Sequence, residues 1–242
     1  MGERSGHVRR PKGVLLDYGG TLVDEAGFDP HAGNTWLLAQ ASHIAPGVTL
    51  ERVLERAHRV VSEVADRRDK FGIEAPWGSL TRLIHDAFGT RFTLDLAELE
   101  RGFWDASVTT LPIAGAREAL DALHAAGVTL AVLSNASFSA AVIRHDLAKH
   151  GLADHLEFVM VTADYVVRKP NALLFDVAAT RMGLAPSDIW VVGDRLDTDI
   201  AGARAAGMQA VWLRPRHAAP SNLPNLTVQD WVDLQRCFER SE

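Results

Sequence analysis

The sequence predicts an α/β fold in which a parallel β-sheet carries an all-α segment inserted after its first strand. Short apolar runs rich in Val, Leu and Ile recur along the chain, and such runs are typical of strands buried on both faces of a parallel sheet. Segments with helical spacing separate these runs, which favours right-handed strand–helix–strand crossovers. The 242 residues are enough for a core domain that carries a smaller one.

The strands are predicted at residues 13–16, 129–133, 158–162, 189–192 and 210–213. Helices are predicted at 114–126, 137–149 and 171–182, because each segment has helical character and stops at or near a glycine. A Pro- and Asn-rich stretch, 214–225, precedes a last short helix. Ligands of such sheets bind outside the carboxyl ends of the strands, so the turns after the strands are where chemistry is expected.

Between residues 24 and 110 the pattern changes. Helical spacing with Pro and Gly breaks occupies 31–42, 50–69, 78–88 and 94–104, and no convincing buried strand interrupts it. We therefore expect residues 1–23 and 111–242 to form the α/β core domain and residues 24–110 to form a helical domain.

Composition excludes several classes of protein. The net charge of −6 provides no general attraction to nucleic acid or to an anionic membrane, so we expect neither as a partner. Cys237 is the single cysteine, which rules out an intramolecular disulfide and fits a reducing cytoplasm. The polar start, residues 1–12, contains Arg9 and Arg10, but the apolar run that follows is too short for an export signal.

Polar side chains follow the first two predicted strands. Asp17 ends the first strand and precedes a glycine turn, although a carboxylate at such a place can equally be a turn or helix cap. Ser134 and Asn135 follow the strand at 129–133, and a helix begins within a few residues, so its free N–H groups can favour a phosphate oxygen. The alternative for either residue is a plain helix N-cap.

Two further motifs carry charge. Lys169, in Arg168-Lys169-Pro170, can balance a nearby carboxylate and a substrate phosphate, although a lone Lys-Pro is usually a surface feature. The stretch 192–200 places Asp194, Asp197 and Asp199 within six residues after a buried strand. Crowding three carboxylates is costly unless a cation neutralises them, and hard oxygen ligands suit Mg²⁺.

Together, in this order and each at a strand end, the four motifs resemble those of the haloacid dehalogenase superfamily, whose core is Rossmann-like; the inserted segment is placed like its helical type-1 cap. The resemblance implies that Asp17 is an aspartyl nucleophile that acts with Lys169 on a small phosphorylated substrate. It also implies a phosphate site that would use Ser134, Asn135, Thr21 and Lys169. A Mg²⁺ site would use Asp17, the Gly19 carbonyl, Asp194 and Asp199. The family spacing Gly-Asp-x4-Asp selects Asp199 over Asp197. We expect a monomer or a homodimer.

One position departs from the family. Most of its phosphatases carry a second Asp two residues after the nucleophile, where it protonates the leaving alcohol and then activates water; here that position is Gly19. General acid–base catalysis contributes on the order of 10²–10⁴ in rate. Residues downstream that could replace the acid are Asp24, Glu25, His31, His43, His58 and His85.

The departure leaves three functions open. The first is a Mg²⁺-dependent phosphatase. The second is a carbon–halogen hydrolase that forms an ester on Asp17, since halide leaves without an acid. The third is a pseudoenzyme that keeps the phosphate and metal pocket but has lost efficient turnover. Phosphonate-cleaving members use a cap lysine instead, and Lys70 is the clear lysine in the inserted segment.

Overall fold

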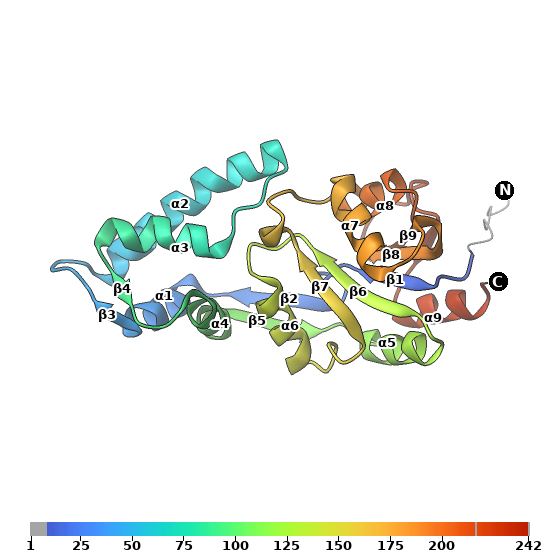
Figure 1. Ribbon diagram of the computed structural model, residues 1–242, viewed down its shortest axis with the longest axis horizontal. Helices are drawn as coiled ribbons and strands as arrows, with labels where there is room; N and C mark the ends of the chain where they lie inside the picture. Colours follow the sequence, from blue (N-terminus) through green and yellow to red (C-terminus); the bar gives the residue numbers. More distant parts are fainter. Residues whose placement is uncertain (1–8, 216, 242) are drawn as a thin grey trace.

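The computed structural model describes residues 9–215 and 217–241, and its core is a six-stranded, all-parallel sheet (Figure 1). The strand order is β10-β9-β8-β1-β6-β7. The bounds are β1 Gly13–Leu16, β6 Thr129–Ser134, β7 Leu156–Val161, β8 Ile189–Gly193, β9 Gln209–Leu213 and β10 Leu226–Val228. The α/β prediction and its five strands are confirmed, and β10 is an addition at the sheet edge. Residues 1–8, most of the polar N-terminal stretch, lie outside the described residues.

Helices cover both faces of this sheet. Val14 and Leu16 belong to one buried cluster, which α5 (Ala116–Ala125), α6 (Ala140–Lys149) and α9 (Trp231–Glu239) cover. Leu15, between them, points into the other cluster, under α7 (Ala172–Met182) and α8 (Ala201–Ala205). This alternation is why the strands are apolar at every position: each face has its own helices to bury.

Several helix ends follow the glycines of the sequence. Gly183 caps α7 with φ 66°, a left-handed conformation that glycine adopts without steric cost. Shorter helical turns are Asp86–Phe88, Thr162–Asp164, Pro186–Asp188 and the π-helical turn Leu196–Ile200. Within the described ranges, no helix is long and apolar enough to cross a membrane.

The inserted segment contains α1 (Pro30–Ala39), α2 (Leu50–Phe71), α3 (Trp77–His85) and α4 (Leu96–Ser107), which we call the cap. It also contains strands that we did not expect. An antiparallel pair, β2 (Val23–Phe28) and β5 (Val108–Pro112), connects the cap to the core, and β3 (Ala41–His43) pairs with β4 (Arg91–Phe92). Five of the six β2 residues are exposed, so β2 lacks the apolar run that marks a buried strand.

A buried carboxylate links the cap-side elements to the core. Asp146, on α6, accepts hydrogen bonds from Tyr18 Oη (2.6 Å), Trp104 Nε1 (3.1 Å) and Thr110 Oγ1 (2.9 Å). Its donors come from the turn after β1, from α4 and from β5. Because burying a carboxylate is costly without hydrogen bonds, these donors hold the elements in one arrangement around it.

Candidate active site

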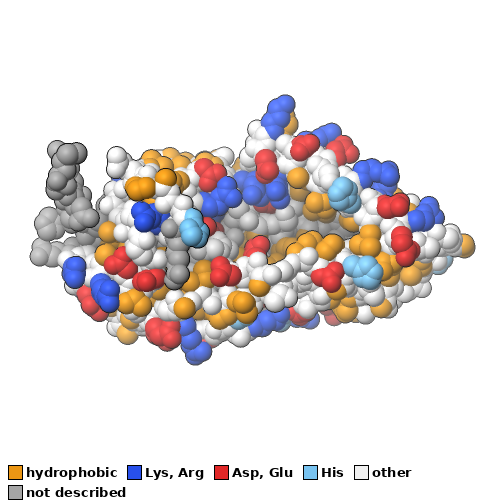
Figure 2. All heavy atoms as spheres, turned by 180° about the vertical axis from the view of Figure 1, so that it is seen from behind, with side chains coloured by type: hydrophobic (Ala, Val, Ile, Leu, Met, Phe, Trp, Pro, Cys, Tyr) orange, Lys and Arg blue, Asp and Glu red, His pale blue; other side chains and the backbone are white. Residues whose placement is uncertain are grey.

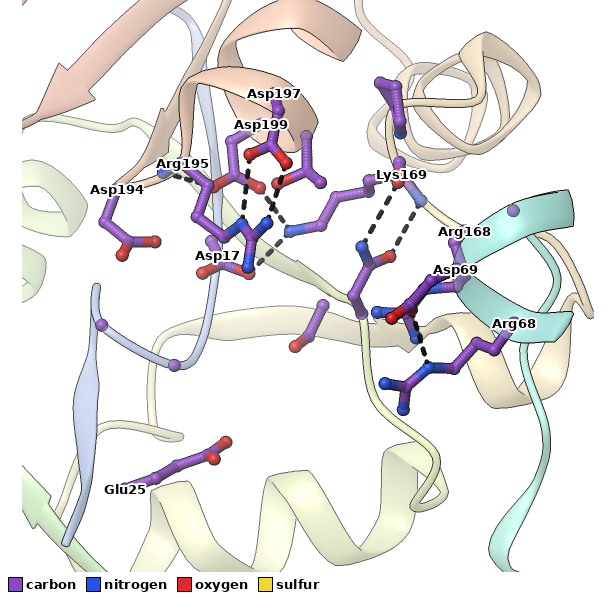
Figure 3. Close-up of a pocket in the computed structure, with 17 residues that line it drawn as sticks. Asp17, Glu25, Arg68, Asp69, Arg168, Lys169, Asp194, Arg195, Asp197 and Asp199 are labelled. Carbon is purple, nitrogen blue, oxygen red and sulfur yellow. Dashed lines mark hydrogen bonds and ion pairs between the residues drawn. The ribbon is translucent and has the colours of Figure 1, made fainter. Parts of the chain in front are cut away.

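The carboxyl ends of the central strands bring the predicted residues to one cavity of about 750 Å³ (Figure 3). Asp17 follows β1, Ser134 ends β6, Asp194 follows β8, and Lys169 lies in the loop before α7. Of the residues predicted for the site, Asp17, Gly19, Ser134, Asn135, Lys169, Asp194 and Asp199 line this cavity, and Thr21 does not.

Lys169 lies at the centre of the charged residues. It is 5% exposed, so the alternative of a surface lysine is wrong. Its Nζ donates to Asp17 Oδ1 (2.6 Å) and to the Leu133 carbonyl (2.8 Å), and lies 2.6 Å from Asp199 Oδ1. Burial by itself would lower the pKa of Lys169, but the charges of Asp17 and Asp199 outweigh it and raise that pKa above its usual value.

Asn135 holds the loop that carries Lys169. Its Oδ1 accepts from the Lys169 backbone N–H (2.8 Å), and its Nδ2 donates to the Lys169 carbonyl (3.3 Å). Helix α6 starts at Ala140 with Ser139 as its N-cap, so neither Ser134 nor Asn135 caps it. The amide of Asn135 therefore aligns the end of β6 with the lysine loop.

Thr21 lies behind the cavity wall and does not line the cavity. It is fully buried, and its hydroxyl lies 3.5 Å from Asp17 Oδ2. The turn around it is tight, because the Tyr18 carbonyl accepts from the backbone N–H groups of Leu22 (2.8 Å) and Val23 (3.1 Å). This position favours a role in orienting Asp17 over contact with a ligand.

Three carboxylates surround one point of the cavity wall. Asp17, Asp194 and Asp199 each offer an oxygen, and these oxygens lie within 4.8 Å of one another. Burial, opposed by Lys169 and assisted by Asp199, raises the pKa of Asp17 to about 7. Burial and the charge of Asp199 raise the pKa of Asp194 to about 6. The three groups are thus held close together against their mutual repulsion.

These residues fit a hard divalent cation. Asp194 Oδ1 is buried and has no hydrogen-bond partner among the described residues, which leaves a ligand position open. Gly20 has φ 75°, and a Cβ there would lie 2.6 Å from Asp194 Oδ2, so only glycine leaves room for this carboxylate. Asp197 is exposed and pairs with Arg195 (2.8 Å), outside the group of three.

Glu25 is the acidic candidate that reaches the cavity. It lies on β2 and lines the cavity, whereas the neighbouring Asp24 does not. A Cβ built on Gly19 would lie 3.2 Å from Glu25 Oε1. The protein atoms around its carboxyl group and the charge of Asp146 raise the pKa of Glu25 above its usual value.

The other candidate acids lie elsewhere. His31, His58 and His85 line a second cavity of about 530 Å³ in the cap. This cavity is largely apolar, and Figure 2 shows a hollow whose cap half carries hydrophobic side chains. His43 is exposed on β3, and Lys70 lies over the Phe71 ring rather than in the site cavity.

Three arginines from the cap and from the loops after the strands complete the cavity wall, and none of them was predicted as a site residue. Arg68 at the end of α2, together with Arg168 and Arg195, lines the cavity. Each of these cations has a carboxylate partner: Asp69, Glu74 and Asp197 respectively. Arg168 precedes Lys169 and Arg195 follows Asp194, so their adjacency to motif residues was the available signal, whereas nothing in the sequence marked Arg68.

A family model described as haloacid dehalogenase-like hydrolase matches residues 11–207. The chain is 29% identical over 233 residues to phosphoglycolate phosphatase of Chromobacterium violaceum, covering 94% of this chain and 96% of that protein. It is 37% identical over 108 residues to phosphoserine phosphatase of Thermus thermophilus, covering 43% and 42%.

A solved structure resembles the chain over nearly its whole length. The 2-haloacid dehalogenase of Pseudomonas syringae pv. Tomato DC3000 superposes with a TM-score of 0.63 at 26% identity, covering 94% of this chain and 97% of that one. Several curated relatives match less completely, because the matched region spans half of their length or less.

Proposed function

Because the chain belongs to the haloacid dehalogenase-like hydrolases, we propose that it is a Mg²⁺-dependent phosphatase of a small phosphorylated metabolite, with Asp17 as the nucleophile. The observation that carries the proposal is the contact of Lys169 with both Asp17 and Asp199 at the wall of the cavity. This contact brings the Asp17 carboxylate, a fixed positive charge and a second carboxylate, that of Asp199, to one point. The names of two relatives, which act on phosphoglycolate and phosphoserine, favour a phosphate ester as substrate.

The chain's own residues suggest how the first step proceeds. Lys169 engages Asp17 Oδ1, which leaves Oδ2 to attack phosphorus and form an aspartyl-phosphate. Thr21 lies beside Oδ2 and limits its rotation. The Lys169 ammonium and the polar groups of Ser134 are placed to receive phosphate oxygens.

Asp17, Asp194, Asp199 and the Gly19 carbonyl would hold Mg²⁺. The bound ion would supply positive charge that offsets the charge of the phosphoryl group and of the three carboxylates. We also propose that the protein is cytoplasmic and that it is a monomer or a homodimer. Size-exclusion chromatography with light scattering tests the oligomeric state.

The test is Asp17→Asn, assayed on a panel that contains phosphoglycolate, phosphoserine and an acyl phosphate, with and without Mg²⁺. Loss of the nucleophile should reduce turnover to below about 1% of wild type. Asp197→Asn is the matched control, because Asp197 is exposed and outside the group of three. Circular dichroism checks that both variants fold. An Asp17→Asn protein that keeps wild-type turnover contradicts the proposal.

A carbon–halogen hydrolase is the second candidate, and the likeness to the 2-haloacid dehalogenase favours it. That reaction also forms an ester on the aspartate, but it needs no metal. The cluster of Asp194 and Asp199 beside Asp17 would then have no purpose. Halide release from a 2-haloacid that persists in excess chelator would select this function over the first.

A further inference from the structure

We propose that Glu25 supplies the acid and base that the glycine at position 19 lacks, so that the carboxyl group reaches the site from β2 instead of from the turn after β1. This inference rests on the proposed phosphatase function. Three separate features of the structure support this role of Glu25.

The first feature is the space above Gly19. A Cβ on Gly19 would lie 3.2 Å from Glu25 Oε1 and 3.8 Å from its Cδ. A side chain at position 19 would therefore extend to the place where the Glu25 carboxyl group already lies. Figure 3 shows Glu25 directed into the cavity from the side opposite Lys169.

The second feature is the local distortion of β2. Glu25 pairs with Thr110 of β5, but the next paired residue is Gly27, opposite Thr109, so Ala26 is an extra residue in the ladder. Such a bulge redirects the side chains next to it and is common beside active sites. Asp24, one residue earlier, belongs to the other face of the strand and lies outside the cavity.

The third feature is the place of Glu25 between two cavities. It lines the site cavity and also a neighbouring one of about 410 Å³, which Phe28, Trp104 and Phe138 line as well. Ser134 and Asn135 belong to both. The organic group of a phosphate ester bound beside Asp17 can extend into the neighbouring cavity past Glu25, which lies at the junction of the two.

The chemistry balances without another reactant. As Asp17 Oδ2 bonds to phosphorus, the bond from phosphorus to the leaving oxygen breaks, and protonated Glu25 donates its proton to that oxygen, which departs as an alcohol. The resulting Glu25 carboxylate then takes a proton from water as the water oxygen bonds to phosphorus. The bond from phosphorus to Asp17 breaks, phosphate leaves, and Glu25 is protonated again.

The experiment compares Glu25→Gln with wild type on benzyl phosphate and benzoyl phosphate. The two substrates have the same ring, but benzyl alcoholate is a strong base that needs a proton, whereas benzoate leaves unaided. We expect kcat/KM for benzyl phosphate to fall by about 10²-fold or more, and kcat/KM for benzoyl phosphate to change by less than about threefold. With benzoyl phosphate, the phosphorylated protein should accumulate, because the second step has lost its base; mass spectrometry after acid quench detects it.

Asp24→Asn is the matched control, and we expect it to leave both rates unchanged. A double variant tests the same role independently. Glu25→Ala combined with Gly19→Asp should hydrolyse benzyl phosphate faster than Glu25→Ala alone, because removing the glutamate side chain makes room for the aspartate. Equal losses on the two substrates, or no gain in the double variant, would overturn the role of Glu25. If wild type hydrolyses neither substrate nor any of the panel above, the phosphatase function itself fails.

Discussion

Glu74, in the linker between α2 and α3, forms an ion pair with Arg168, the residue immediately before Lys169. The Glu74 side chain is completely buried, and it also accepts hydrogen bonds from Thr162 Oγ1 (2.7 Å) and Ser137 Oγ (2.9 Å). The backbone is joined at the same place, because Arg168 N donates to the Gly72 carbonyl (2.9 Å). The cap is therefore attached to the loop that carries Lys169, in addition to its connection through β2 and β5.

We expect Glu74→Gln to destabilise the protein and to slow the reaction. Breaking a buried ion pair leaves one charge without its partner, which costs about 3 kcal/mol. The loop before Lys169 would lose a fixed contact. Because a small displacement of a reacting group slows the reaction, kcat/KM should fall by roughly tenfold. Urea unfolding and steady-state kinetics measure the two effects.

Glu63→Gln is the matched control for this prediction. Glu63 also pairs with an arginine, Arg67, but both side chains are 66% exposed, and such surface pairs contribute little. We expect no measurable change in unfolding or in rate. If Glu74→Gln behaves like this control, the attachment of the cap to the lysine loop has no functional effect.

The core and the family could be predicted because their signals are local. A strand buried on both faces is apolar at each position, and the residue after it lies at the ligand-binding edge, so Asp17, Ser134 and Asp194 could be placed from sequence order alone. The close approach of these residues then followed from the parallel arrangement of β1, β6 and β8.

The remainder depends on contacts between residues far apart in the chain. Glu74 and Arg168 are 94 residues apart, and no pattern around either residue marks the pair. Glu25 was one of six candidate acids, and the sequence did not show which of the alternating β2 side chains, Asp24 or Glu25, faces the cavity. Thr21 was predicted to bind substrate from its place in the motif, which does not indicate the direction of a side chain; in the structure its buried hydroxyl lies 3.5 Å from Asp17 Oδ2.

Divalent metal should stabilise the folded protein. Three carboxylates within 4.8 Å repel one another, and Lys169 supplies a single compensating charge, so a bound cation would relieve the repulsion. We expect the Tm to rise on addition of millimolar Mg²⁺, and the rise to disappear in Asp194→Asn. Calorimetry of the free and Mg²⁺-loaded proteins measures this without any substrate.

Asp197→Asn serves again as the control for metal binding, and it should keep the Mg²⁺-dependent rise in Tm. Without metal, Asp194→Asn should be no less stable than wild type, because it removes one of three crowded charges. A Tm that does not respond to Mg²⁺, Mn²⁺ or Ca²⁺ in wild type would contradict the metal site.

Replacing Lys169 should impair the reaction more than the fold of the metal-loaded protein. In Lys169→Gln the positive charge beside Asp17 and Asp199 is lost, and a charge that stabilises the transferring phosphoryl group is typically worth about 10²–10³ in kcat. Lys169→Arg should not restore the rate, because the planar guanidinium does not fit where a compact ammonium contacts three oxygens. Rates within threefold of wild type in either variant would contradict a catalytic role of Lys169.

The cap contains a buried histidine, His85. His85 is 2% exposed, packs against the Phe92 ring, and has no hydrogen-bond partner for either ring nitrogen among the residues that the structure describes. Burial lowers its pKa from 6.5 to about 4. Between these two values the unfolded chain binds a proton that the folded protein does not. The folded protein therefore loses stability as the pH falls from about 6.5 towards 4, and His85 has no such effect above about pH 6.5.

Between pH 7 and pH 5 wild type should therefore lose about 2 kcal/mol more of its unfolding free energy than His85→Phe, whose ring takes up no proton. Urea unfolding at the two pH values measures the difference, and the exposed His43→Leu should match wild type at both. If His85→Phe loses as much stability as wild type, His85 is not the group that titrates, and the cap cavity around it admits enough water to solvate the charged ring.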